Sequence, residues 1–76
     1  MDDADGRDGR DGRLAGTVQA QLPQALYRVL LDSGHVVTAH LREDIRKNFV
    51  RILVGDRVLV RVSPYDVTRG RIEERT

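Results

Sequence analysis

The sequence has no cysteine and no tryptophan among its 76 residues, and its aromatic residues are limited to Tyr27, Phe49 and Tyr65. Without cysteine, the chain can form neither a disulfide framework nor a thiolate metal site. No apolar run approaches the roughly 18 residues of a membrane-spanning helix, and no charged-then-apolar signal segment stands at the N-terminus. These absences predict a protein of a reducing compartment, with a cytoplasmic location and no membrane partner.

The chain also lacks the residue patterns that catalysis or metal binding requires. His35 and His40 are an odd number of positions apart, so on one regular strand they point to opposite faces and cannot easily share a metal or act as an acid–base pair. There is no His-x-x-x-His, glycine-rich phosphate loop or Asp-rich metal loop. Adjacent acidic residues occur but diverge on either regular element: Asp2-Asp3, Glu43-Asp44 and Glu73-Glu74. We therefore expect no enzymatic activity, no metal and no cofactor.

The net charge of +1 hides an asymmetry between two parts of the chain. Residues 1–13 repeat a Gly-Arg-Asp unit and hold five aspartates and three arginines, whereas residues 14–76 hold ten basic and seven acidic side chains. No large apolar residue lies between Met1 and Leu14, so nothing there offsets the entropy of ordering the backbone. We predict a disordered tail over 1–13 and a mildly basic folded domain over 14–76, which by itself only weakly indicates a nucleic-acid partner.

Four stretches of the domain alternate between apolar and polar residues, as half-buried strands do, and a fifth, short strand is expected around Ile72. Pro23-Gln24 interrupts the first alternation, Gly34 suits a tight hairpin turn with positive φ, and Pro64 must end the fourth strand because it cannot donate to a ladder. The strands are expected at 14–22, 25–31, 35–41, 57–62 and 70–75. Their inward residues are expected to include Val18, Tyr27, Val29, Leu31, Val37, Ala39, Leu41, Val58, Val60, Val62 and Ile72.

Between the third and fourth strands lies a segment that mixes cations with large apolar residues. We interpret it as a short helix over 42–48 followed by an extended run that ends at Gly55-Asp56. A three-stranded meander, a helical connection and two further strands form the element order of the OB-fold, a small Greek-key barrel. An SH3-like barrel also has five strands and remains an alternative, but the long third connection favours the OB-fold.

In OB-folds, oligonucleotides bind the face of strands 2–3 and the loops that join strands 1–2 and 4–5. In this chain that face carries Arg28, Thr38 and His40, together with the loop 63–69. Gly70 lies between Arg69 and Arg71, where a glycine would let the backbone approach a phosphate. Tyr65 has two equally weighted interpretations: it stacks on a base, or its ring covers the open end of the barrel. The scarcity of outward aromatic residues favours recognition by phosphates and shape over stacking.

Several motifs together resemble the bacterial translation initiation factor 1 family. They are Gly34-His35-Val36-Val37-Thr38-Ala39-His40, Arg46-Lys47-Asn48-Phe49-Val50-Arg51-Ile52-Leu53 with Gly55-Asp56, Pro64-Tyr65-Asp66, and Gly70-Arg71-Ile72, within a match from Gly16 to about Ile72. The resemblance implies an OB-fold monomer that binds the A site of the small (30S) ribosomal subunit. Its expected partners are 16S rRNA, a ribosomal protein near the A site and the other initiation factors. Its expected role is to assist assembly of the initiation complex and to block premature binding of tRNA to the A site.

The resemblance also implies which residues contact rRNA. They are Arg46, Lys47 and Arg51 in the basic segment, Tyr65, Arg69 and Arg71 in the last loop and strand, and His35 and His40 in the second motif. The chain departs from the family pattern at Glu43-Asp44 and at Glu73-Glu74, and the second departure predicts a last strand that pairs less well. Two other functions stay open: a single-stranded RNA chaperone of the cold-shock type, and a protein-interaction module with an outward patch of Leu26, Leu30 and Leu59.

Overall fold

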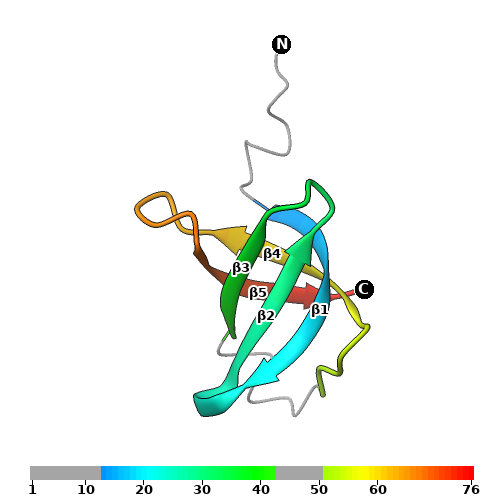
Figure 1. Cartoon of the computed structure of the whole chain (residues 1–76). Coiled ribbons are helices and arrows are strands. Elements are labelled where there is room, and N and C mark those ends of the chain that lie inside the picture. Colours follow the sequence, from blue (N-terminus) through cyan, green and yellow to red (C-terminus); the bar gives the residue numbers. More distant parts are fainter. Residues whose placement is uncertain (1–12, 43–50) are drawn as a thin grey trace.

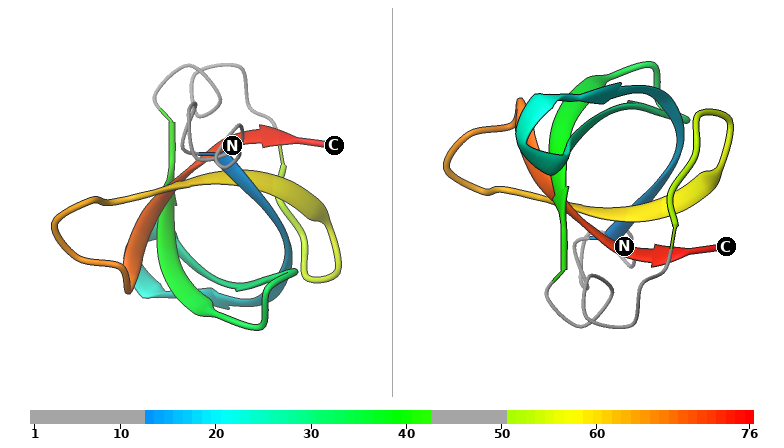
Figure 2. Two further views of the ribbon diagram at one scale, coloured as in Figure 1. Left: turned by 90° about the horizontal axis from the view of Figure 1, so that it is seen from above. Right: turned by 90° about the horizontal axis from the view of Figure 1, so that it is seen from below.

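The computed structural model describes residues 13–42 and 51–76, which form a closed β-barrel (Figures 1 and 2). Its strands follow one another around the barrel in the order β1-β2-β3-β5-β4, and β4 pairs with β1 to close it. The strands are β1 (Arg13–Leu22), β2 (Leu26–Leu31), β3 (Val36–Leu41), β4 (Arg57–Val62) and β5 (Arg69–Arg75). All pairs are antiparallel except β3 with β5. This all-β architecture confirms the predicted OB-fold.

The core consists of the side chains that the alternation places inside the barrel. Val29, Val37, Ala39, Val60 and Ile72 are buried almost completely, and Leu41 and Val62 pack against this cluster from the ends of their strands. The inward positions predicted for β2, β3 and β4 are thus confirmed. Because the side-chain period of a strand is two, one slip of register would turn this entire set outward.

Two irregularities interrupt the alternation. In β1 the register with β2 shifts between Val18 and Ala20, which leaves Gln19 as an extra residue. In β5 the register with β4 shifts so that Ile72 pairs with Val60 and Glu74 with Leu59, which leaves Glu73 as an extra residue. Bulges of this kind bend a strand and redirect a side chain, and neither was predicted from the sequence.

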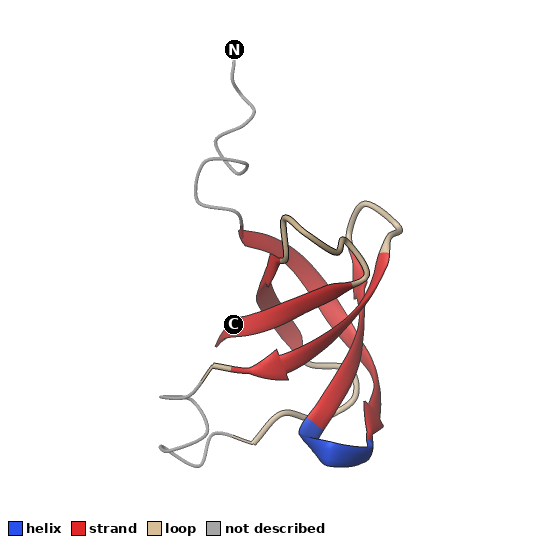
Figure 3. Cartoon of the chain, turned by 90° about the vertical axis from the view of Figure 1, so that its left-hand side faces the viewer, coloured by secondary structure: helices blue, strands red, loops and turns tan. Residues whose placement is uncertain are grey.

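The β1–β2 and β2–β3 connections are short. Between β2 and β3, Gly34 adopts a φ of 95°, as the turn prediction required. Between β1 and β2 the chain forms a single 3₁₀ turn, η1 (Pro23–Ala25), in which Gln24 and Ala25 have left-handed φ values of 65° and 60° (Figure 3). Observed strand ends differ from the predicted ones by at most one residue. In the part of the chain that the structure describes, no helix is long and apolar enough to cross a membrane.

Of three predictions about the chain's organisation, two concern residues that lie mostly outside the described part of the chain, and the third is contradicted. The helix over 42–48 lies outside the described residues apart from Arg42, and so does the tail apart from Arg13, which already begins β1. The expectation that Glu73-Glu74 weakens the last strand is wrong. β5 pairs with β4 from Gly70 to Arg75 and with β3 from Arg69 to Ile72, because the bulge accommodates the extra residue without ending the ladder.

Candidate nucleic-acid interface

The pairing register brings polar side chains from different strands into rows on the outer surface of the barrel. In one row, Leu26 of β2 is paired with His40 of β3, His40 with Arg71 of β5, and Arg71 with Arg61 of β4. Residues directly opposite each other on neighbouring strands have Cβ atoms about 4.5–5.5 Å apart. Four residues that are far apart in the sequence therefore form a continuous strip.

A second row runs beside the first. Thr38 of β3 is paired with Arg28 of β2 on one side and with Arg69 of β5 on the other. Neither Arg28 nor Arg69 forms an ion pair within 13–42 or 51–76. Both guanidinium groups can therefore contact an external anion, and the charge of Arg69 also acts on Asp66, whose pKa it helps to lower.

Between the two rows and the β4–β5 loop lies a groove of about 360 Å³. Its polar lining comes from three strands and the start of that loop, and its apolar lining from Leu26, Val62 and Pro64. The polar side chains are those of Thr38, His40, Arg61, Ser63, Arg69 and Arg71. Planar guanidinium groups bind phosphate in a bidentate manner, and an apolar floor can contact a sugar or base. The groove therefore suits a nucleic-acid backbone.

The β4–β5 loop (63–68) is held in shape by its own side chains. Ser63 Oγ accepts hydrogen bonds from the backbone amides of Tyr65 (3.1 Å) and Asp66 (3.2 Å). The Asp66 carboxylate accepts from the Thr68 hydroxyl (2.6 Å) and amide (3.0 Å). The side-chain bond from Thr68, followed by its backbone bond, lowers the pKa of Asp66. The loop is thus an ordered wall of the groove.

This loop is also tied to β3 and to the turn before it. The Thr38 amide donates to the Thr68 carbonyl at 2.9 Å, and His35 Nε2–H donates a hydrogen bond to the Val67 carbonyl oxygen at 3.0 Å. Although His35 and His40 are close in sequence, their roles differ. His35 anchors the loop, whereas His40 lines the groove beside Arg71.

Tyr65 stands at the tip of this loop and is 96% exposed. A ring that covered the open end of the barrel would lose most of its accessible surface, so that interpretation is wrong. The buried tyrosine is instead Tyr27, which lies in the core as expected. Tyr65 keeps both faces of its ring free, which is the arrangement that stacking on a base requires.

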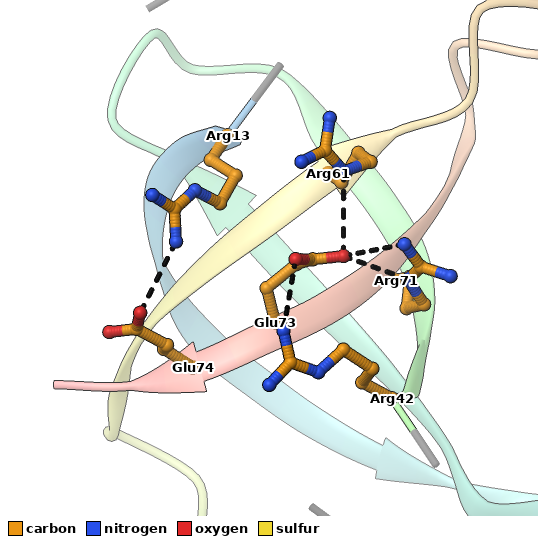
Figure 4. Close-up of polar contacts among 6 residues, drawn as sticks. All are labelled: Arg13, Arg42, Arg61, Arg71, Glu73 and Glu74. Carbon is orange, nitrogen blue, oxygen red and sulfur yellow. Dashed lines mark hydrogen bonds and ion pairs between the residues drawn. The ribbon is translucent and has the colours of Figure 1, made fainter. Parts of the chain in front are cut away.

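One carboxylate organises the cations beside the groove (Figure 4). Glu73 is only 5% exposed and forms ion pairs with three arginines. The shortest is with Arg71 Nη2 at 2.7 Å, and those with Arg61 Nε and Arg42 Nη1 are both 3.4 Å. Burial by itself raises the pKa of Glu73, but the hydrogen bond from Arg71 and the charges of Arg71, Arg61 and Arg42 outweigh it, so the pKa falls below its ordinary value. Glu73 is therefore an ionised group shared by three cations.

Three other arginines each pair with a different acid. Arg57 Nη1 and Nη2 donate to the two carboxylate oxygens of Asp32 at 2.8 and 2.7 Å, and this bond lowers the pKa of Asp32. Arg13 pairs with Glu74 at 3.2 Å, to one side of the Glu73 cluster in Figure 4. Arg75 lies 3.9 Å from Asp56. These pairs cancel their own charge and leave little to attract an anion.

The fold brings some of the predicted rRNA contacts together and separates others. His40, Arg69 and Arg71 come together in the groove, and Tyr65 and His35 belong to the adjoining loop and its anchor. Arg51 is exposed but does not line the groove; it precedes buried Ile52 in the segment that leads to β4. Arg46 and Lys47 lie outside the described residues. Leu26, Leu30 and Leu59 are each partly exposed, so the outward leucine patch stays a prediction.

Sequence reasoning missed two parts of this site. Arg61 was not among the predicted contacts, because its partner on β5 depends on the register of β4. Gly70 had been expected to admit a phosphate, but a Cβ there would lie 2.9 Å from Val60 Cγ1 and 3.0 Å from the Arg61 carbonyl oxygen. The glycine is needed for close packing of β4 on β5. Within the described residues no group of three His, Asp or Glu side chains could hold a metal.

Comparison with known proteins agrees with this geometry. A family model described as translation initiation factor 1A / IF-1 (eIF-1a) matches residues 3–76. The chain is similar to the solution structure of translation initiation factor 1 from the wolbachia endosymbiont strain TRS of Brugia malayi, with 42% identity over 84% of this chain and 76% of that one and a TM-score of 0.70. It is also similar to the crystal structure of YjeQ from Thermotoga maritima, with 28% identity and a TM-score of 0.68.

The two structural likenesses differ in extent. The YjeQ match covers 84% of this chain but only 22% of that protein, so it concerns one part of a longer chain. The family match covers nearly the whole sequence, and its members are translation initiation factors, a non-enzymatic kind of protein. Together with the closed five-stranded barrel and the arginine-lined groove, these matches establish that the chain belongs to the translation initiation factor 1A / IF-1 family.

Proposed function

We propose that this translation initiation factor binds the A site of the small (30S) ribosomal subunit through 16S rRNA, as a monomer in the cytoplasm. There it assists assembly of the initiation complex beside the other initiation factors and a ribosomal protein, and it blocks premature binding of tRNA. The observation that carries the proposal is the groove, in which His40, Arg61, Arg69 and Arg71 converge from three strands.

The chemistry of this groove suits structured RNA. Arginine side chains and a threonine hydroxyl offer donors to phosphate and ribose oxygens, which position a protein on RNA without reading its sequence. One exposed tyrosine is too few for a binding mode based on successive stacked bases. The proposed rRNA contacts are His35, His40, Arg46, Lys47, Arg51, Tyr65, Arg69 and Arg71. We add Arg61 of the groove and Arg28 of the second row to them.

Binding to purified small ribosomal subunits tests the proposal directly. The full chain, labelled at its N-terminal tail, is titrated with subunits at two salt concentrations, with an unstructured single-stranded RNA as competitor. We expect saturable binding that the competitor does not displace and that weakens with salt, because phosphate contacts release counterions. Equal binding to both RNAs would favour a general RNA chaperone, and binding to neither would favour a protein-interaction module.

The location on the subunit needs a second measurement. Chemical probing of 16S rRNA with and without the factor is expected to show protection at A-site nucleotides, and the factor is expected to compete with tRNA for the A site but not for the P site. Protection elsewhere, together with unchanged A-site tRNA binding, would show that the factor binds the subunit at another site.

A further inference from the structure

We propose that Glu73 is a positioning residue for RNA binding: it fixes the guanidinium groups of Arg61 and Arg71 so that their remaining N–H groups face an RNA phosphate. The inference rests on the proposed function and deepens it. It predicts that an acidic residue beside the groove strengthens the binding of a polyanion, which is the opposite of what its charge alone would do.

The backbone sets up this role through the bulge in β5. Ile72 is paired with Val60 and Glu74 with Leu59, so Glu73 is the extra residue between them. A bulge redirects the side chain of such a residue. Glu73 is 5% exposed although it is charged, whereas the neighbouring Glu74 is exposed. Burial of a carboxylate is tolerated only where cations and hydrogen bonds compensate for lost water.

Glu73 contacts only one edge of the guanidinium groups of Arg61 and Arg71, and it does not contact their outer edges. Arg71 donates from Nε (2.8 Å) and contacts from Nη2 (2.7 Å) the same oxygen, Oε2. Arg61 approaches that oxygen through Nε alone at 3.4 Å. A guanidinium has five N–H donors, so Glu73 uses the inner edge of each group. In Figure 4 the terminal nitrogens of Arg61 point away from Glu73. Both arginines line the groove.

The sign of the effect follows from a competition between order and charge. Arginine loses much rotamer freedom when it grips a ligand, and a group that is already held in place loses less on binding. Against this, Glu73 contributes one negative charge, but three arginines surround it and its carboxylate is shielded from solvent. The cluster therefore stays cationic towards the outside, and the gain from order exceeds the loss from repulsion.

Two isosteric variants separate the effects of order and charge. Glu73→Gln and Glu74→Gln add the same charge at neighbouring positions, but Glu74 contacts Arg13 and not the arginines of the groove. We expect Glu73→Gln to bind small subunits about tenfold more weakly than the wild type, because two long side chains must then be ordered on binding. Glu74→Gln is expected to bind as tightly as the wild type or slightly more tightly. Tighter binding by Glu73→Gln would overturn the proposal.

A variant that keeps the negative charge tests the positioning role in a protein that is expected to stay folded. Glu73→Asp keeps the negative charge but is one methylene shorter, so it reaches Arg61 and Arg71 less well. We expect it to fold, as judged by its thermal melt, and to bind several-fold more weakly than the wild type. Wild-type affinity in a folded Glu73→Asp protein would contradict the proposal.

A measurement on the free protein separates this inference from the proposed function. Side-chain Nε–Hε resonances of Arg61 and Arg71 in NMR spectra are expected to be sharp and distinct in the wild type and in Glu74→Gln, and to collapse towards the solvent-averaged position in Glu73→Gln. If they are unchanged in Glu73→Gln, Glu73 does not hold them and the inference fails. If they collapse while the wild type binds no subunits, only the proposed function fails.

Discussion

Two sets of arginines on the barrel, which we call the groove side and the paired side, use the same residue type in different ways. Beside the groove, Arg42, Arg61 and Arg71 share the single carboxylate of Glu73, and Arg28 and Arg69 form no ion pair in the described part of the chain. In the second set, Arg13, Arg57 and Arg75 each have an acid of their own, and Arg13 lies beside Arg61 in the β1–β4 ladder. Five arginines on the groove side thus share Glu73 and the more distant Asp66, whereas the three on the paired side have three acids.

This difference shows that local pairing, not the number of cations, creates a phosphate-binding surface. The whole sequence has a net charge of only +1, which says little about its partners. A surface ion pair contributes little to stability, but it neutralises a cation that could otherwise bind a phosphate. An RNA-binding face therefore arises where acids are scarce.

The largest expected effect comes from neutralising two arginines on each side. Arg28→Gln with Arg69→Gln removes two unpaired cations from the groove side, and Arg13→Gln with Arg75→Gln removes two paired ones. We expect the first double variant to bind small subunits about 100-fold more weakly, since two charge-assisted contacts at roughly 1.5 kcal/mol each are lost. Its salt dependence should also be shallower, by about two contacts. Fluorescence titration at several salt concentrations measures both.

The control double variant is expected to stay within about threefold of the wild type, because its charges are already cancelled. Thermal melts of both proteins establish that each is folded. If the two double variants weakened binding equally, net charge would govern binding and the distinction between the two sides would be lost.

Tyr65 tests whether the groove side uses a ring as well as charges. Tyr65→Ala is expected to reduce affinity by about 1–3 kcal/mol if the ring stacks on a base. Its melting temperature should not change, because the side chain is 96% exposed and packs against nothing. Tyr65→Phe keeps the stacking surface and is expected to bind like the wild type. Unchanged affinity in Tyr65→Ala would leave recognition to phosphates and shape alone.

Acid unfolding compares the carboxylates of the two sides and has the smallest expected effect. Glu73 and Asp32 both have pKa values below their ordinary ones. A carboxyl group whose pKa is lower in the folded state stabilises the protein above the unfolded-state pKa, near 4, and this contribution disappears as the pH falls through the folded-state pKa. We expect Glu73→Gln to melt about 4–8 °C lower at pH 7, a loss of about 1 kcal/mol that its partly exposed partners limit.

For Asp32→Asn the expected decrease is smaller, because this pair is exposed to solvent. In both variants the difference from the wild type should shrink as the pH falls below about 4. Circular dichroism melts between about pH 2 and pH 7 measure it. A larger decrease for Asp32→Asn than for Glu73→Gln would mean that the paired side, not the groove side, holds the more stabilising carboxylate.

Much of the fold was accessible from the sequence. Alternation identified β1 to β4 and the inward residues of β2, β3 and β4, because strand periodicity is a local property that a half-buried sheet imposes on its sequence. The last strand was expected around Ile72. Gly34 and Pro64 marked their connections for equally local reasons. The bulges at Gln19 and Glu73 escaped prediction, since a bulge shows only when the partner strand is in place.

The site was only partly accessible. His40, Arg69 and Arg71 were named through the family resemblance, and the groove brings them together. Arg61 was not selected, because nothing near it in sequence reveals that it is paired with Arg71 across β4 and β5. The interpretation of Tyr65 as a covering ring failed for a related reason: exposure at a loop tip depends on how the loop leaves the barrel.

The sequence by itself determined the strands, their inward faces and the membership of a translation initiation factor family, because these depend on local alternation and on motifs that neighbouring residues form. The tertiary structure alone decided which arginines are neutralised. Arg71 and Glu73 are two residues apart, but Arg61 and Arg42 reach the same carboxylate from other parts of the chain. Ion pairing depends on distance in space, and only the closed barrel sets that distance.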